Sequence, residues 1–282
     1  MIEERRGSKT ALGVAWLRAA HQVIDSPPLI LEDPAIVDLF GREPVEHLRT
    51  APGALQTPGA RALRSHVVLR SRYVEDRLQL AEGRGTRQYV ILGAGYDTFI
   101  LRQPEWAKAL RIYEVDHPST QMEKRARISR AGRTVPPNAS FVGIDFEQES
   151  LKEGLVRSDV RFDAQTFFSW LGVTMYLTEA AVDAVLRTVL EFPAGSEIAF
   201  TFAQPAASGQ EGAMRVIAER AAAMGEPWLT YFEPEALERK LRDLGFAQVE
   251  FLEPADCAAR YFADRADKLP APTRTTIVSA TI

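Results

Sequence analysis

The stretch Tyr89-Val90-Ile91-Leu92-Gly93-Ala94-Gly95-Tyr96-Asp97-Thr98 decides the fold. Its first four residues are apolar and β-prone, which predicts a buried strand, and two glycines follow one residue apart. Gly93 permits a tight turn, Gly95 lets a ligand approach the backbone closely, and a helix is expected after the turn. This order is typical of nucleotide-binding α/β proteins, although a plain tight turn explains the same glycines.

The residue type three positions after the second glycine distinguishes dinucleotide-binding proteins from those that bind other nucleotides. A dinucleotide-binding fingerprint has a third glycine there, which lets helix and strand pack closely beneath a pyrophosphate. This chain has Thr98 at that position. The residue therefore weighs against NAD as the ligand.

Downstream of the glycines, short β-prone runs alternate with helical patterns. Seven strands are expected near residues 89–92, 112–115, 141–144, 166–170, 198–202, 247–252 and 275–280. The clearest helix between them spans 178–190, and another begins at Pro234. The alternation predicts an α/β fold with a mostly parallel seven-stranded sheet, helices on both faces and a ligand beyond the carboxyl ends of the strands.

The first 85 residues have a different pattern, typical of helices and loops. Helices are expected over 11–23 and 61–81, with a short apolar piece at 34–40 and a connector over 44–59 that is rich in Pro and Gly. We expect a helical cap over 1–85 in front of an α/β domain over 86–282. The excursion at 204–231 is a further candidate for a lid.

Composition excludes several classes of function. The chain has 282 residues, of which 46% are hydrophobic and 26% charged, and its net charge is −4 with no block of like charge. This balance argues against disorder and against binding along a nucleic-acid duplex. The single cysteine, Cys257, excludes an internal disulfide and a cysteine metal cluster. With no apolar span or signal peptide evident, we expect a cytoplasmic protein without a metal or a membrane partner.

Two acidic residues follow predicted strands and suit an adenosine ligand. Asp116 lies about 20 residues after the glycine turn, where a carboxylate accepts hydrogen bonds from ribose hydroxyls, although it also suits a helix cap. Asp145 follows the third strand, where it would accept from an adenine amine while Phe146 packs on the ring. A loop cap is again the alternative for Asp145.

Arg70 lies on the same helical face as Val67 and Val74. An arginine on an apolar stripe needs an anionic partner, because an unpaired buried charge is costly. A ligand carboxylate held by two parallel hydrogen bonds would serve, and an internal Asp or Glu would serve equally.

Taken in order, these motifs resemble the leucine carboxyl methyltransferase family. The resemblance rests on R-S-R-Y at 70–73, L-G-A-G-Y-D-T at 92–98, E-V-D-H-P at 114–118 and G-I-D-F at 143–146, with S-K-T-A-L at 8–12 and R-A-A-H-Q at 18–22 resembling the bacterial branch. That branch includes S-adenosylmethionine-dependent methyltransferases and polyketide carboxyl O-methyltransferases. The resemblance implies a class I methyltransferase (Rossmann-like) fold with a helical N-terminal cap over the cofactor, S-adenosylmethionine.

The resemblance also assigns cofactor contacts residue by residue. Arg70 would bind the carboxylate of the cofactor, and Lys9 would also reach the cofactor, while Gly93, Ala94 and Gly95 form the turn beneath it. Asp116 takes the ribose position, and Asp145 with Phe146 takes the adenine position. One departure is Leu171, which stands where the family has an acidic residue facing the cofactor's amino group. Backbone carbonyls near Ser169 and Trp170 are the candidate replacement.

The function implied is methyl transfer to an oxygen of a small molecule. A carboxylate acceptor is ionised at neutral pH and needs no general base, whereas a phenol with a pKa near 10 would benefit from one. The four histidines, of which His117 and His21 are nearest to the expected site, are candidate bases, although each is more often structural. The alternatives are an NAD-dependent oxidoreductase on the same sheet and a binding module that keeps the cofactor fold without turnover.

Overall fold

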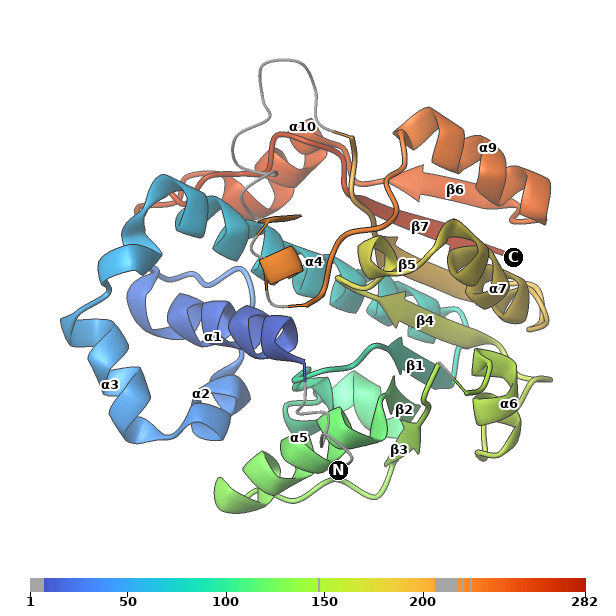
Figure 1. The fold of residues 1–282 in the computed structure, drawn as a ribbon, viewed down its shortest axis with the longest axis horizontal. Coiled ribbons are helices and arrows are strands. Elements are labelled where there is room, and N and C mark those ends of the chain that lie inside the picture. The colour runs from blue at the N-terminus through green and yellow to red at the C-terminus, as the bar shows by residue number, and fades with distance from the viewer. Residues whose placement is uncertain (1–7, 147, 206–217, 220, 224) are drawn as a thin grey trace.

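The fold is a seven-stranded sheet between two layers of helices (Figure 1). It is taken from a computed structural model, which describes every residue except 1–7, 147, 206–217, 220 and 224. The strands are β1 (Gln88–Leu92), β2 (Arg111–Asp116), β3 (Ala139–Gly143), β4 (Thr166–Trp170), β5 (Glu197–Thr201), β6 (Gln248–Phe251) and β7 (Ile277–Thr281).

The strand order confirms the predicted fold class. Across the sheet the order is β3-β2-β1-β4-β5-β7-β6, and only β7 runs antiparallel to its neighbours β5 and β6. The order reverses between β1 and β4, which are adjacent in the sheet but distant in the chain. Ligands of open α/β sheets bind at such a reversal, beyond the carboxyl ends of the strands.

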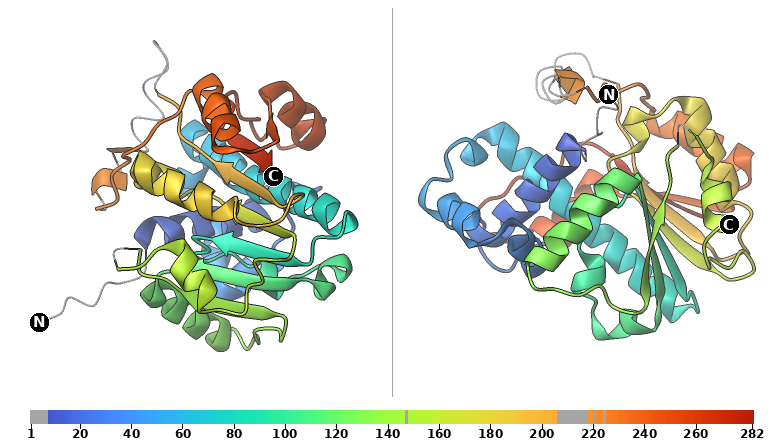
Figure 2. Two further views of the ribbon diagram at one scale, coloured as in Figure 1. Left: turned by 90° about the vertical axis from the view of Figure 1, so that its right-hand side faces the viewer. Right: turned by 60° about the horizontal axis from the view of Figure 1, so that its bottom comes forward.

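Side chains alternate between the two faces of the sheet along each strand, so each face carries its own apolar core. Val90 and Leu92 of β1 pack with apolar residues of α6 (Leu151–Val156), α7 (Glu179–Val189) and α9 (Pro234–Leu244). Tyr89 and Ile91 pack with α4 (Pro58–Gly83) on the opposite face. A strand buried on both faces is apolar throughout, as β1 is. The helices are α1 (Lys9–Ile24), α2 (Pro34–Phe40), α3 (Arg42–Thr50), α4 (Pro58–Gly83), α5 (Pro118–Arg130), α6 (Leu151–Val156), α7 (Glu179–Val189), α9 (Pro234–Leu244) and α10 (Pro254–Cys257). Figure 2 shows helices on both sides of the sheet.

From residue 8 onward three helices precede α4, and we refer to them as the cap. α1, α2 and α3 lie together beside the sheet, and α4 runs from them along one of its faces (Figure 1). The second half of α4 packs on the sheet through Val74 and Leu78, whereas Val68, nearer its start, packs with Ile30 and Leu31. α4 therefore joins the cap to the sheet, so a domain boundary at residue 85 stays a prediction.

Two local expectations were wrong. The segment 44–59, expected to be a connector, contains most of α3, because Pro44 lies in the first turn, where no backbone donor is needed, and Val45 and Leu48 are buried. The glycine turn after β1 is followed by a single 3-10 turn, Phe99–Leu101, rather than by an α-helix. Phe99 and Ile100 are nevertheless buried against the sheet.

No helix within the described part of the chain is both long enough and apolar enough to cross a membrane.

Candidate functional site

The glycine turn after β1 packs closely against two other segments. Gly93 and Gly95 have φ values of +63° and +49°, in the left-handed region that favours glycine. A Cβ on Gly93 would lie 2.4 Å from Val173 Cγ2, in the loop after β4, and one on Gly95 would lie 3.3 Å from Ala11 Cβ in α1. The turn therefore brings together the ends of β1 and β4 and the first turn of the cap.

Asp116, at the end of β2, is bonded to this turn. Its Oδ2 accepts from the Gly95 backbone N–H at 2.6 Å, and its Oδ1 accepts from the His117 N–H at 2.7 Å. Burial raises the pKa of Asp116 against the effect of these two donors. The expected alternative role of capping the next helix is taken by His117, whose side chain accepts from Ser119 N–H at the start of α5.

Arg70, in α4, is buried beside the loop after β4 and has no anionic partner among the described residues. Among the described residues three arginines are buried, and Arg18 and Arg64 each pair with an aspartate, at 2.6 Å and 2.7 Å. Arg70 makes no hydrogen bond or ion pair within the described residues. Its two terminal nitrogens lie 2.7 Å and 2.9 Å from where a Cβ of Gly172 would stand.

Burial and neighbouring charges change the pKa of Arg70. Burial lowers the pKa of Arg70 to about 10, the Arg18 charge adds to the effect, and Tyr176 and Asp97 oppose it. A buried guanidinium without a carboxylate is energetically costly. The arrangement therefore suits an anionic ligand.

Asp145 and Phe146 follow β3 as expected. Asp145 Oδ2 accepts from Gln148 Nε2 at 2.7 Å and lies 3.8 Å from His117 Nε2. Phe146 is 49% exposed. An open ring beside a carboxylate is suited to stacking with a base, and their role at the adenine position stays a prediction.

The first turn of α1 meets the long excursion between β5 and α9. Lys9 is exposed there as the first residue of α1. Its neighbours Ser8 and Thr10 both donate to the Glu226 carboxylate, Ser8 at 3.0 Å. Much of the lid candidate at 204–231 lies outside the described residues, so only Glu226 and the segment around it can be placed.

Thr98 is part of a buried network that fixes the cap to the sheet. Its hydroxyl donates to Asp33 Oδ1 at 2.6 Å and accepts from Arg18 Nη2 at 2.9 Å. Arg18 also lies 3.3 Å from Asp97 Oδ2 and Arg102 lies 3.3 Å from Asp33 Oδ1. The residue that replaces the third glycine of a dinucleotide fingerprint thus binds cap side chains.

The Ser169 side chain is held inside the sheet, and the contact of backbone carbonyls near Ser169 with the cofactor stays a prediction. Ser169 is buried within β4, and its hydroxyl lies 2.9 Å from the Tyr89 hydroxyl on the α4 side of the sheet. Leu171 is partly buried and packs in the same apolar core. Gly172, which the sequence did not single out, lies in the loop after β4 beside Arg70, and its φ of +74° explains why a glycine is needed. The sequence signal that could have identified Gly172 was a glycine two residues after the predicted end of a strand at Trp170.

The two histidines named as bases are held by other groups. His21 is fully buried, with Nδ1 2.8 Å from Asp25 Oδ2 and Nε2 accepting from the Ile30 backbone N–H at 3.2 Å. With both ring nitrogens engaged, His21 has a structural role and is not open to an acceptor. The Nδ1 of His117 lies 2.8 Å from the Ser119 hydroxyl.

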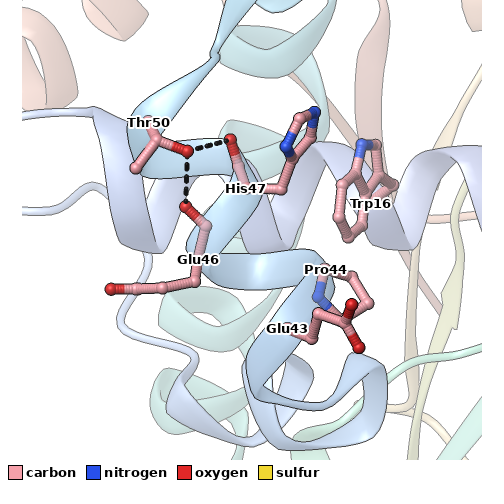
Figure 3. A pocket seen from close by; sticks show the side chains of 6 residues that line it. All are labelled: Trp16, Glu43, Pro44, Glu46, His47 and Thr50. Carbon is pink, nitrogen blue, oxygen red and sulfur yellow. Dashed lines mark hydrogen bonds between the residues drawn. The ribbon is translucent and has the colours of Figure 1, made fainter.

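A separate groove lies on the cap. It is lined by Trp16 of α1 together with Glu43, Pro44, Glu46, His47 and Thr50 of α3 (Figure 3). None of these residues belongs to the strand-end cluster described above, so the groove is not part of the candidate site.

The comparisons with known proteins identify the family. The family model described as leucine carboxyl methyltransferase matches residues 11–190. The chain belongs to this family. The relative named "Putative S-adenosyl-L-methionine-dependent methyltransferase YktD", from Bacillus subtilis (strain 168), is 32% identical over 294 aligned residues, covering 96% of each chain. A protein of the same description from Parafrankia sp. (strain EAN1pec) is 30% identical over 70% of this chain and 66% of its own.

Solved structures agree on the fold. A DUF574 family protein from Streptomyces avermitilis superposes with a TM-score of 0.57 at 17% identity, covering 100% of this chain and 99% of that one. A protein described as a putative methyltransferase from Thermobifida fusca gives 0.56 at 19%, covering 86% and 91%. At such identities the likeness shows the fold alone. The family and the class I methyltransferase fold expected from the motifs are thus confirmed, and NAD-dependent oxidation is not supported.

Proposed function

We propose that the protein uses S-adenosylmethionine to methylate a carboxylate oxygen of a small molecule. Arg70 is the observation that carries the proposal. It is a buried guanidinium at the carboxyl end of β4 that lacks an anionic partner among the described residues. A ligand that brings a carboxylate to this point supplies the missing partner, and the amino-acid end of S-adenosylmethionine is such a group.

The other strand ends fit the remainder of the cofactor. The left-handed turn at Gly93 and Gly95 lies at the switch point between β1 and β4, where the cofactor of this fold is expected. Asp116 would accept from ribose hydroxyls with lone pairs not used by the Gly95 N–H. Asp145 and the open ring of Phe146 would hold the adenine. The names of the relatives above carry the same cofactor.

The chemistry needs positioning more than it needs a base. When bound, the cofactor supplies an electrophilic methyl group, and the acceptor oxygen forms the C–O bond as the C–S bond breaks. A carboxylate reaches this step already ionised. Because both ring nitrogens of His21 are engaged, its imidazole is not free to deprotonate a phenol. The residues that remain bind, orient and exclude water.

Contacts between the cap and the excursion at 204–231 would exclude water from the site. Glu226 binds Ser8 and Thr10 at the start of α1, and Leu229 N–H donates to the Met175 carbonyl at 2.7 Å. These bonds join the excursion to the cap on one side and to the loop after β4 on the other. We infer that the segment around Glu226 closes over the bound ligands.

The test is the chemical nature of the methylated product. The protein should be incubated with methyl-labelled S-adenosylmethionine and a panel of carboxylic acids and phenols, with release of S-adenosylhomocysteine as the measure of turnover. A methyl ester loses its label as methanol in mild alkali, whereas a phenyl ether keeps it. Alkali-labile product supports carboxylate methylation, and alkali-stable product from phenols alone would contradict it.

A further inference from the structure

His66 lies one helical turn before Arg70 on α4. Residues four apart on a helix share one face, so the two side chains are neighbours beyond the end of the sheet. His66 is partly buried, and its Nδ1 lies 3.4 Å from the Thr276 hydroxyl. Within the described residues its Nε2 has no hydrogen-bonding partner. This nitrogen is not fully buried.

The order of the strands across the sheet locates His66 relative to the residues expected to bind the cofactor. The residues expected to hold the cofactor follow the sheet from β3 (Asp145) through β2 (Asp116) and β1 (Gly93) to β4, where Gly172 meets Arg70. The next strand across the sheet is β5, and the residue after it, Phe202, donates from its backbone N–H to the Thr276 carbonyl at 3.0 Å. His66 contacts Thr276. His66 therefore lies near the end of β5, next to the end of β4, where we expect the amino-acid end of the cofactor.

The imidazole is neutral in this environment. Burial and the nearby Arg70 charge lower the pKa of His66 to about 3. If the Thr276 hydroxyl donates to Nδ1, the single ring proton is on Nε2. The ring then presents a neutral donor beyond β5.

We propose that His66 binds the methyl acceptor by donating a hydrogen bond from Nε2 to one oxygen of a monocarboxylate. This inference rests on the proposed function and names the residue that selects the acceptor class. A neutral donor orients a carboxylate without pairing its negative charge, so the second oxygen keeps its reactivity. A phenol would instead need a group that accepts its proton, and an imidazole that protonates only in strong acid is a poor base.

The experiment measures acceptor binding and turnover separately. The probes are benzoate, phenylacetate and octanoate, with phenol and benzyl alcohol as neutral counterparts. Each is titrated into the S-adenosylhomocysteine complex while the histidine ring signals are followed by ¹H–¹⁵N NMR, and kcat/KM is measured with S-adenosylmethionine. The variants are His66→Phe, which removes the donor, and His66→Gln, whose amide nitrogen reaches about as far as Nε2. His47→Phe, on the exposed groove of Figure 3, is the matched control.

At least one carboxylate should shift the His66 ring signals and be methylated by the wild type. His66→Phe should lower kcat/KM for that acid by about 10- to 100-fold, His66→Gln should restore part of the loss, and S-adenosylhomocysteine affinity should change by less than about twofold. His47→Phe should match the wild type.

Equal rates in His66→Phe and wild type would overturn the inference, as would ring signals that respond only to phenol or to no probe. Failure of the wild type to bind S-adenosylhomocysteine would instead refute the proposed function, and the inference with it.

Discussion

At the scale of single residues, the site depends on a contact between Gly172 and Arg70. Gly172 has a φ of +74°, and a Cβ there would lie 2.7 Å from Arg70 Nη1. The missing side chain therefore leaves room for the guanidinium to reach the end of β4. The same absence lets Gly172 N–H donate to Thr201 Oγ1 at 2.7 Å in this conformation.

Replacing Gly172 with alanine should displace Arg70 and weaken cofactor binding. Gly132→Ala is the matched control, because Gly132 has a similar φ of +67° but nothing within 4 Å of a Cβ. Both variants should lose about 1 kcal/mol of stability through backbone strain. Only Gly172→Ala should also lower affinity for S-adenosylhomocysteine, by about tenfold or more. Equal affinities in the two variants, measured by calorimetry, would argue against the contact.

At the scale of elements, buried charges hold the cap on the sheet. Asp33, at the start of α2, is fully buried and pairs with Arg18 of α1 at 2.6 Å and with Arg102 at 3.3 Å. Thr98, beyond the glycine turn, donates to the same carboxylate. Two segments, α1 and the 3-10 turn flanked by Thr98 and Arg102, thus meet on one aspartate.

Asp33→Asn should destabilise the protein strongly. Removing one partner of a buried ion pair costs about 3–5 kcal/mol, because the other charge stays buried. Glu105→Gln is the control, since its pair with Lys108 is exposed and should contribute at most about 1 kcal/mol. Urea denaturation compares the two. A loss for Asp33→Asn no larger than that for Glu105→Gln would show that the cap is held by apolar contacts instead.

The elements themselves were largely predictable, and the exceptions have physical causes. β4 has the predicted bounds, because its apolar run ends at a glycine-containing loop. α3 was not predicted, because a proline such as Pro44 near the start of a helix cannot be told in the sequence from one that breaks a helix in a loop. Phe141–Ile144 was expected as a strand, but β3 begins two residues earlier and ends at Gly143.

At the scale of the whole molecule, His66 should make stability depend on pH. In the unfolded chain a histidine takes up a proton near pH 6.5, whereas in the folded protein the pKa of His66 is about 3. The unfolded state therefore binds more protons between these values, and the free energy of unfolding falls as pH is lowered from about 6.5 towards 3.

His66→Gln should remove this contribution. Between pH 7 and 5 the wild type should lose roughly 1–2 kcal/mol more stability than the variant, from about 1.4 kcal/mol per pH unit. His47→Gln, at an exposed position, should follow the wild type. Parallel pH profiles of wild type and His66→Gln in urea denaturation would contradict the assigned environment of His66.

The sequence predicted which residues lie at the strand ends, whereas it did not predict the contacts around them. Glycine turns and acidic strand ends are local patterns, so Gly93, Asp116 and Asp145 could be named in advance. The contacts of Arg70 with Gly172, of His66 with Thr276 and of Thr98 with Asp33 join positions far apart in the chain. No local pattern encodes such pairs, and the sequence left open whether an internal carboxylate neutralises Arg70.

The account depends most on Arg70 holding the carboxylate of the cofactor. Calorimetric titration of S-adenosylhomocysteine into wild type, Arg70→Ala and Arg72→Ala tests this directly, since Arg72 is half exposed on the same helix and pairs with Asp76. Arg70→Ala should weaken binding by about 2–5 kcal/mol, while Arg72→Ala should leave it unchanged. Wild-type affinity in a folded Arg70→Ala variant would contradict the account.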